Sequence, residues 1–236
     1  MLRLEGVEFS YPSAPESTMH FDLQVDDGEV LGLIGPSGSG KSTLLHLVAG
    51  FLRASAGRIV VDEQDLQNLP VAARPVSIVF QQHNLFPHLD LYTNVALGVD
   101  PSLRLAPAQV DAVRAALARL GLESLQHRKP GELSGGQRQR VALARALVRR
   151  RKILLLDEAF AALGPALRAE LIELVRELVQ EQQMAALLVS HQPGDALIAS
   201  ARCAFICDGR VAALADTAQL LAGSEPPQLR AYLGSQ

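Results

Sequence analysis

The octapeptide Gly35-Pro36-Ser37-Gly38-Ser39-Gly40-Lys41-Ser42 directly follows Val30 to Ile34, an apolar run typical of a buried parallel strand. Residues 41–52 then have the pattern of a helix. The spacing G-x-x-x-x-G-K-S between a strand and a helix is that of a phosphate-binding loop. A dinucleotide motif that starts at Gly38 and Gly40 would need glycine at position 43, where the chain has Thr43.

The chemistry of this loop suits a di- or triphosphate. Glycines leave backbone N–H groups free to face the phosphates, and the following helix points its positive end at them. Lys41 can reach the β- and γ-phosphates, and the Ser42 hydroxyl can hold Mg²⁺. The alternative is a glycine-rich turn that binds nothing. The residues predicted to bind nucleotide are Gly35, Pro36, Ser37, Gly38, Ser39, Gly40, Lys41, Ser42 and Thr43.

Two carboxylates follow a second apolar strand. Ile153 to Leu156 is succeeded by Asp157 and Glu158, at what would be the carboxyl edge of a parallel sheet. Ligands of such sheets bind at that edge. We expect Asp157 to hold hydrated Mg²⁺ and Glu158 to polarise water against the γ-phosphate. A pair of acidic residues that only caps a helix is the alternative.

Between these motifs lies Leu133-Ser134-Gly135-Gly136-Gln137, ahead of a helix predicted from about residue 136 to residue 150. Ser134 offers a hydroxyl, the two glycines expose backbone N–H groups, and the helix presents its positive end. This combination predicts a second anion-binding surface. A helix start with a flexible glycine pair is the alternative.

The bulk properties are those of a globular protein. The chain has 236 residues, 48% of them hydrophobic and 20% charged, with a net charge of −3. This charge gives no general reason to bind nucleic acid or an anionic membrane. No apolar run approaches the roughly 20 residues of a spanning helix, and the N-terminus does not look like a signal peptide. Any membrane-spanning part is therefore expected from another chain. Cys203 and Cys207 are expected to pack in the core.

Strands alternate with helices at both ends of the chain, whereas residues 88–150 are mainly helical. We therefore predict an α/β fold in one domain, residues 1–236. Residues 1–87 and 151–236 form its nucleotide-binding core, and residues 88–150 form an inserted helical subdomain. The tail from Ser224 onward is expected to be loosely ordered.

Several ordered motifs carry a resemblance to a known family. They include Arg74-Pro75-Val76-Ser77, Phe80-Gln81, Asn84 to Leu89, and Pro130 to Leu147. The whole chain resembles the ATP-binding cassette (ABC) family, and within it the ATPase subunits of bacterial thiamine importers. The resemblance implies a P-loop NTPase core with an inserted helical subdomain, and an ATPase that uses ATP and Mg²⁺. Importer ATPases for iron, sulfate and polyamines share most of these motifs, so the same role with another substrate stays open.

The resemblance also assigns roles by position. Tyr11 resembles the aromatic residue that stacks on adenine. Gln81 resembles the glutamine that touches Mg²⁺ and the attacking water, with Gln82 as the less well matched alternative. His191, after the strand predicted at residues 186–190, resembles the switch histidine at the γ-phosphate. The implied catalytic residues are thus Glu158, His191 and Gln81, and the implied metal ligands are Ser42, Gln81 and Asp157.

Partners are implied in the same way. In the family, the loop corresponding to Ser134, Gly135, Gly136 and Gln137 closes over ATP held by a second subunit, which implies a homodimer. Integral membrane permease subunits would be direct partners, a periplasmic substrate-binding protein an indirect one, and nucleic acid none. The expected location is the cytoplasmic face of the bacterial inner membrane. The surface near Leu85, Phe86 and Leu89 is expected to be free of charge, and is either a docking groove or simply core.

One segment departs from the family pattern. Ala159-Phe160-Ala161-Ala162-Leu163-Gly164 stands where related importers have Pro-Phe-Ser-Ala-Leu-Asp. The serine and aspartate of that segment help to join the two ATP sites, and Ala161 and Gly164 cannot make the same hydrogen bonds. We expect hydrolysis to survive, because Glu158 is intact, but with weakened cooperativity.

Two other functions stay open at this point. A soluble ABC protein acting on DNA or ribosomes would usually carry tandem cassettes, coiled coils or basic extensions, and none is apparent in this sequence. A regulatory protein without ATPase activity is favoured only by Gly164. The presence of Lys41, Asp157, Glu158 and His191 argues against it.

Overall fold

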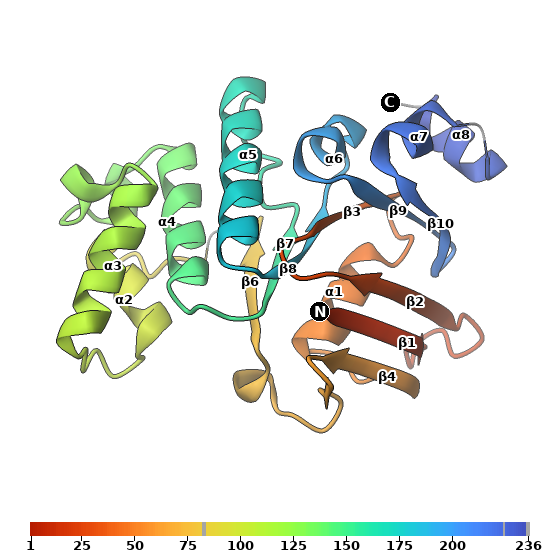
Figure 1. Ribbon diagram of the computed structural model, residues 1–236, viewed down its shortest axis with the longest axis horizontal. Coiled ribbons are helices and arrows are strands. Elements are labelled where there is room, and N and C mark those ends of the chain that lie inside the picture. The colour runs from red at the N-terminus through yellow and green to blue at the C-terminus, as the bar shows by residue number, and fades with distance from the viewer. Residues whose placement is uncertain (82–83, 224, 235–236) are drawn as a thin grey trace.

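A mixed ten-stranded sheet runs through the molecule in the order β5-β4-β1-β2-β10-β9-β3-β8-β7-β6 (Figure 1). The structure is a computed structural model that describes residues 1–81, 84–223 and 225–234. Within these ranges no helix combines the length and the apolar character needed to cross a membrane.

The parallel half of the sheet is buried on both faces. It consists of β9 (Arg202–Cys207), β3 (Val30–Ile34), β8 (Ala185–Val189), β7 (Ile153–Asp157) and β6 (Val76–Phe80). Side chains alternate between the two faces of a strand. Ile153 and Leu155 of β7 therefore join the core cluster that includes Leu44 and Leu45 of α1. Leu154 and Leu156 join the cluster on the other face, with residues of α4 and α5.

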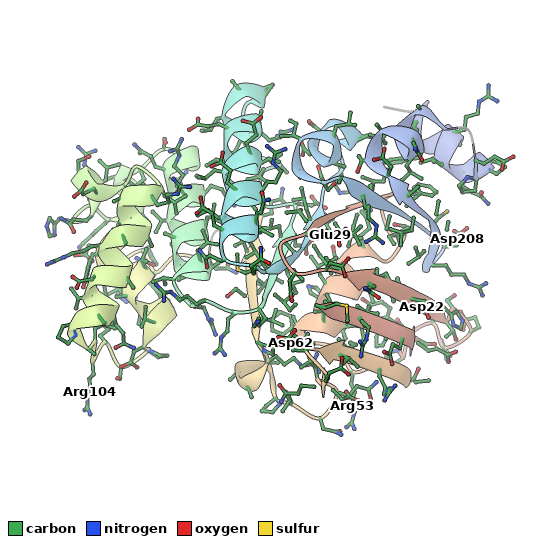
Figure 2. All side chains as sticks on the ribbon, in the orientation of Figure 1. Asp22, Glu29, Arg53, Asp62, Arg104 and Asp208 are labelled. Atoms are coloured by element: carbon green, nitrogen blue, oxygen red, sulfur yellow. The ribbon has the colours of Figure 1, made fainter. Side chains whose placement is uncertain are left out.

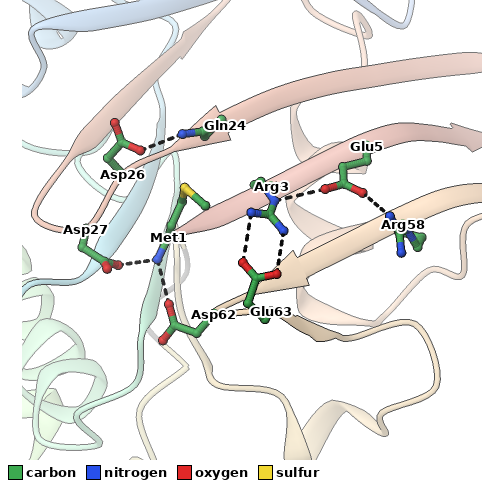
Figure 3. Close-up of polar contacts among 9 residues, drawn as sticks. All are labelled: Met1, Arg3, Glu5, Gln24, Asp26, Asp27, Arg58, Asp62 and Glu63. Atoms are coloured by element: carbon green, nitrogen blue, oxygen red, sulfur yellow. Dashed lines mark hydrogen bonds and ion pairs between the residues drawn. The ribbon is translucent and has the colours of Figure 1, made fainter.

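The antiparallel half consists of β1 (Leu2–Phe9), β2 (Met19–Val25), β4 (Ala56–Val61), β5 (Gln64–Asp65) and the β9 partner β10 (Arg210–Asp216). A network of charges, shown in Figure 3, lies over β1, β4 and the turn after β4. Arg3 binds the Glu63 carboxylate, and Arg58 binds Glu5 at 2.8 Å. The Met1 amino group lies 2.9 Å from Asp62, which also pairs with Lys152 ahead of β7. The network ties the antiparallel half to the parallel half.

The helices divide into three groups (Figure 1). α2 (Leu91–Val99), α3 (Pro107–Arg119) and α4 (Gly135–Leu147) lie together at one end of the molecule. α1 (Lys41–Ala49) covers one face of the parallel strands, and α5 (Pro165–Glu181) and α6 (Pro193–Ala199) cover the other. α7 (Thr217–Ala222) and α8 (Pro227–Leu233) follow β10. Short 3₁₀ turns occupy Val71–Ala73, Glu123–Leu125 and Pro130–Glu132.

The predicted strands and helices that surround the motifs are present, with shifted ends. Helix α1 stops at Ala49 rather than Leu52, because Gly50 adopts a left-handed conformation and caps it. The expectation of a loosely ordered tail is wrong for the part of the tail that the structure describes. Residues 227–233 form α8, whose Leu229 and Tyr232 are buried against Phe205 and Ile34. The tail hides only two large apolar side chains, too few to show as a periodic pattern.

Candidate nucleotide-binding and catalytic site

Four functional segments leave the sheet at the same edge. The phosphate-binding loop follows β3, His191 follows β8, Asp157 and Glu158 end β7, and Gln81 follows β6. β3, β8, β7 and β6 are consecutive neighbours in the parallel half. Their carboxyl ends therefore converge, although the residues come from distant parts of the chain.

The phosphate-binding loop is held tightly from behind. Gly35 has φ +148°, and a Cβ there would lie 2.0 Å from the Ile206 carbonyl oxygen, so glycine is required. The Lys41 ammonium group donates to the carbonyl oxygens of Gly35 at 2.8 Å and Pro36 at 2.7 Å. Burial lowers the pKa of Lys41, and the carboxylates of Glu158 and Asp157 oppose that shift. The ammonium is thus a partly desolvated charge at the mouth of the loop.

The predicted metal ligands Ser42 and Asp157 meet at the end of β7. The Ser42 hydroxyl donates to Asp157 Oδ1 at 3.0 Å across 115 residues of sequence. Burial raises the pKa of Asp157, and the hydrogen bond from Ser42 opposes that shift. Within the described residues, no group of three or more His, Cys, Asp and Glu side chains is arranged to hold a metal ion by itself. One carboxylate and one hydroxyl suit Mg²⁺, which commonly takes its other ligands from water and phosphate oxygens.

Glu158 and His191 face each other across the ends of β7 and β8. Glu158 Oε1 lies 2.5 Å from His191 Nε2. Glu158 adopts φ +48°, which is uncommon for a residue with a side chain. Its backbone N–H donates to the Val189 carbonyl at 3.2 Å, which holds it in place. Strained backbone of this kind gathers at functional sites.

Sequence reasoning did not identify the residues that support these two. The Ser190 hydroxyl donates to buried Asp195 of α6 and accepts from the Gln192 backbone at 3.0 Å, so the turn around His191 is anchored. Buried Arg168 of α5 donates to the carbonyls of Phe160 and Leu163 in the segment after Glu158. The Ser190 and Arg168 contacts are formed by the tertiary fold, and no sequence motif predicts them.

Tyr11 lies beside the start of α1. Its hydroxyl is 3.0 Å from Thr43 Oγ1, and its ring meets Phe9 edge-on at 4.8 Å between centroids. Gln81 is exposed at the end of β6. The alternative residue Gln82 lies outside the described residues.

The signature segment lies elsewhere, at the start of α4, among the helices at the end of the molecule (Figure 1). Ser134 and Gln137 cap the helix reciprocally: the Gln137 backbone N–H donates to Ser134 Oγ at 3.2 Å, and the Ser134 N–H donates to Gln137 Oε1 at 2.9 Å. Ser134 is exposed. A Cβ on Gly136 would lie 2.3 Å from the Leu167 side chain, so glycine allows α4 and α5 to approach closely.

The departing segment has no tight packing at its end. Gly164 is the N-cap residue of α5, has φ −65° and ψ 155°, and makes no side-chain cap. A Cβ on Gly164 would meet nothing within 4 Å. An aspartate would therefore fit this position without strain.

A groove of about 560 Å³ opens beside β6, between the core and the helices α2 and α4. Exposed Phe51, Val71 and Phe86 line it, at 49%, 45% and 44% exposure. Arg145 and Arg149 also line it, so the expectation of a charge-free surface is wrong. These arginines come from the end of α4 and the turn after it, far in sequence from Phe86.

The two cysteines are buried in and beside the sheet, and both are free thiols. Burial raises the pKa of Cys203 to about 12. Asp208, at the turn between β9 and β10 (Figure 2), contacts the Cys207 sulfur. Packing is thus the role that their surroundings support.

Comparison with known proteins shows which family this chain resembles. The sequence model of the ABC transporter family matches residues 18–161. The chain is 49% identical over 236 residues to the thiamine import ATP-binding protein ThiQ of Chelativorans sp. (strain BNC1), covering 100% of this chain and 95% of that protein. It is 50% identical over 233 residues to ThiQ of Brucella abortus, covering 99% and 95%. It is 48% identical over 223 residues to ThiQ of Shigella boydii, covering 94% and 95%.

Solved structures agree. A dimeric post-hydrolysis state of the ATP-binding cassette MJ0796, bound to ADP and phosphate, superposes with a TM-score of 0.79 at 28% identity, covering 92% of this chain and 99% of that one. CbiO1 from Clostridium perfringens, part of the transporter complex cbiONQ, gives 0.83 at 28% identity, covering 95% and 91%. The predicted P-loop NTPase fold of an ABC ATPase is therefore confirmed.

Proposed function

Because this chain belongs to the ABC transporter family, we propose that it is the ATP-hydrolysing subunit of an importer for thiamine and its phosphate esters. The observation that carries the substrate is the identity of about 50% over the whole chain to thiamine import ATP-binding proteins. The chain is an ABC-type ATPase, and ATP is its substrate. The residues gathered at the carboxyl edge of the sheet support this activity.

In the proposed mechanism, Tyr11 stacks on the adenine, and the loop from Gly35 to Thr43 wraps the phosphates. The Lys41 ammonium turns from its carbonyl partners to the β- and γ-phosphates, which are stronger acceptors for a partly desolvated cation. Glu158 orients and polarises the attacking water, and Gln81 helps to position it. His191, 2.5 Å from Glu158, contacts the γ-phosphate and so keeps the Glu158 carboxylate and the γ-phosphate in position relative to each other.

Mg²⁺ fits the pair formed by Ser42 and Asp157, with Gln81 as a further ligand. When bound, it would neutralise charge on the β- and γ-phosphates. A cation there would also offset the burial of the Asp157 carboxylate, whose pKa is raised in this structure. Ser42 and Asp157 already lie within hydrogen-bond distance of each other, so little rearrangement is needed.

A second copy would complete each site. The signature segment, Ser134 to Gln137, begins α4 with Ser134 exposed, in a part of the molecule apart from α1. In a head-to-tail homodimer each signature segment would cover the ATP of the other copy. Loss of the γ-phosphate would remove the contacts of Lys41, His191 and the partner's Ser134, and the dimer would reopen.

Permease subunits are the proposed membrane partners, with a periplasmic substrate-binding protein on the far side. The groove lined by Phe51, Phe86 and Arg145 lies between the nucleotide-binding core and the helical region. A permease segment with apolar side chains and a carboxylate would fit its apolar wall and its arginines. We place the subunit peripherally, at the cytoplasmic face of the bacterial inner membrane. We likewise propose residues 88–150 as the helical signature subdomain, and residues 1–87 and 151–236 as the core.

Ala161 and Gly164 are proposed to weaken communication between the two ATP sites. Neither offers a side-chain hydrogen bond at the position where related importers have serine and aspartate. Arg168 holds the carbonyls of this segment instead, which fixes its shape without providing a group that reaches a second copy.

The decisive assay is ATP hydrolysis in vesicles that contain the permease, the binding protein and this subunit. Thiamine should stimulate hydrolysis, and Glu158→Gln should abolish it. Glu173→Gln, the same chemical change on the exposed face of α5, should leave the rate unchanged. Stimulation only by iron, sulfate or a polyamine would keep the ATPase and overturn thiamine as its substrate.

A further inference from the structure

The side chain of Tyr232 reaches from α8 to the carboxyl edge of the sheet, where the phosphate-binding loop and His191 lie. Its hydroxyl donates to the backbone carbonyl oxygen of His191 at 3.2 Å. The oxygen of the Tyr232 hydroxyl in turn accepts a hydrogen bond from the backbone N–H of Gly35. One phenol therefore touches the first residue of the phosphate-binding loop and the histidine that faces Glu158.

The ring is fixed as firmly as the hydroxyl. Tyr232 is only 7% exposed and lies 5.8 Å from the ring of Phe205, which is fully buried in β9. Phe205 pairs with Ile34, the last residue of β3 before the loop. Packing thus leaves the phenol little freedom, and its oxygen stays between the ends of β3 and β8.

Burial keeps the group in the state that can donate. It raises the pKa of Tyr232, an effect that the Gly35 hydrogen bond opposes, so the hydroxyl remains protonated at neutral pH. The neutral phenol donates to one loop and accepts from the other, a pairing that a phenylalanine ring in the same pocket cannot reproduce.

We propose that Tyr232 is a positioning residue for ATP hydrolysis, which holds the His191 turn at a fixed distance from the phosphate-binding loop. The proposal rests on the role proposed above for His191 at the γ-phosphate. Tyr232 acts through the two backbones and touches neither ATP nor the attacking water. The C-terminal helix is thereby part of the catalytic apparatus, because its last turn sets the spacing of two catalytic loops.

Tyr232→Phe is the direct test, since it keeps the packed ring and removes only the hydroxyl. The loss of one buried hydrogen-bonded link should lower kcat about fivefold to tenfold. KM for ATP should stay within about twofold, because the change removes no group that is proposed to bind the phosphates. Tyr92→Phe makes the same change in α2 and should leave kcat unchanged.

Three measurements separate the outcomes: kcat, KM and the melting temperature of each purified variant. A lower kcat for Tyr232→Phe, well below its melting temperature and with KM retained, supports positioning. A lower melting temperature with unchanged kcat means that the hydroxyl only stabilises the fold, and overturns the proposal. If the wild type hydrolyses no ATP and Glu158→Gln changes nothing, the proposed function itself fails, independently of Tyr232.

Discussion

The carboxyl edge of the sheet, with its proposed catalytic residues, forms hydrogen bonds between distant parts of the chain, whereas the signature segment forms them between near neighbours. At the edge, Ser42 binds Asp157 across 115 residues of sequence. In the signature segment, Ser134 and Gln137 bind each other across 3 residues. The edge is assembled by the tertiary fold, whereas the signature segment is a local cap.

This difference bears on which groups each region can supply to an ATP-binding site. The edge brings the phosphate-binding loop, Asp157, Glu158 and His191 together within one chain. The signature segment places the exposed Ser134 at a helix start, an arrangement suited to an anion that arrives from outside. In the proposed homodimer, a complete site combines the edge of one copy with the signature segment of the other.

The largest effect is expected from breaking the edge at Lys41. Lys41→Met should lower the ATPase rate about 10²–10³-fold, because a preorganised donor to the transferring phosphoryl group is lost. Without nucleotide at pH 7, removal of the buried charge should partly offset the cost of leaving the Gly35 and Pro36 carbonyl oxygens without their donor. ATPase assays and urea titrations measure the two effects.

The free energy of unfolding of Lys41→Met, relative to the wild type, should depend on pH. Burial holds the folded pKa of Lys41 below the ordinary 10.5, so the unfolded chain binds the proton more tightly. The cost of the charge is fully present below the folded pKa and vanishes above 10.5. The free energy of unfolding of Lys41→Met, relative to the wild type, should thus fall as pH rises towards 10.5, and a difference independent of pH would contradict this explanation.

Arg168 tests the segment that joins the edge to α5. Arg168→Met leaves several buried carbonyls without their charged donor and should cost about 3 kcal/mol of unfolding free energy. Urea denaturation measures the loss. Arg176→Met, on the exposed side of the same helix, should change stability by less than about 0.5 kcal/mol. Equal effects of the two changes would refute the role assigned to Arg168.

Much of the edge could be predicted from sequence, because the phosphate loop and the acidic strand end are short motifs with fixed spacing. The contacts that support the edge could not be predicted. Arg168 and Tyr232 donate to backbone carbonyls, which every residue carries, so no sequence pattern marks these acceptors. The arginines of the groove were missed for a related reason: Arg145 and Phe86 meet only after α4 packs beside β6. The buried strands could be predicted from their apolar runs, whereas the packing of α8 through only Leu229 and Tyr232 could not.

Ser134→Ala should affect the signature segment in two separable ways. Loss of the cap should cost about 1 kcal/mol of stability. Loss of a hydrogen bond to phosphate on the partner's ATP should lower the ATPase rate about tenfold or more. Binding of a fluorescent ATP analogue by the monomer should not change. Weaker binding by the monomer would mean that Ser134 contacts ATP within its own chain, contrary to the account.

The smallest effect is expected at Gly164. Gly164→Asp has room for its side chain and supplies an N-cap for α5, so it should raise the free energy of unfolding by up to about 1 kcal/mol. It should also raise the Hill coefficient for ATP or the transport rate. Gly164→Ala is the matched control, because it adds a Cβ without a hydrogen-bonding group. No change in either kinetic quantity for the aspartate variant would count against weakened coupling.

The most direct test of the two-copy site is the molar mass of Glu158→Gln by light scattering, with ATP and with ADP. Slowed hydrolysis keeps the γ-phosphate in place, so ATP should give a particle of twice the 25.3 kDa of one chain. ADP should give the single chain, and adding Ser134→Ala should raise the ATP concentration needed for dimerisation. A single chain that has bound ATP to saturation, or a dimer indifferent to nucleotide, would contradict a site shared between two copies.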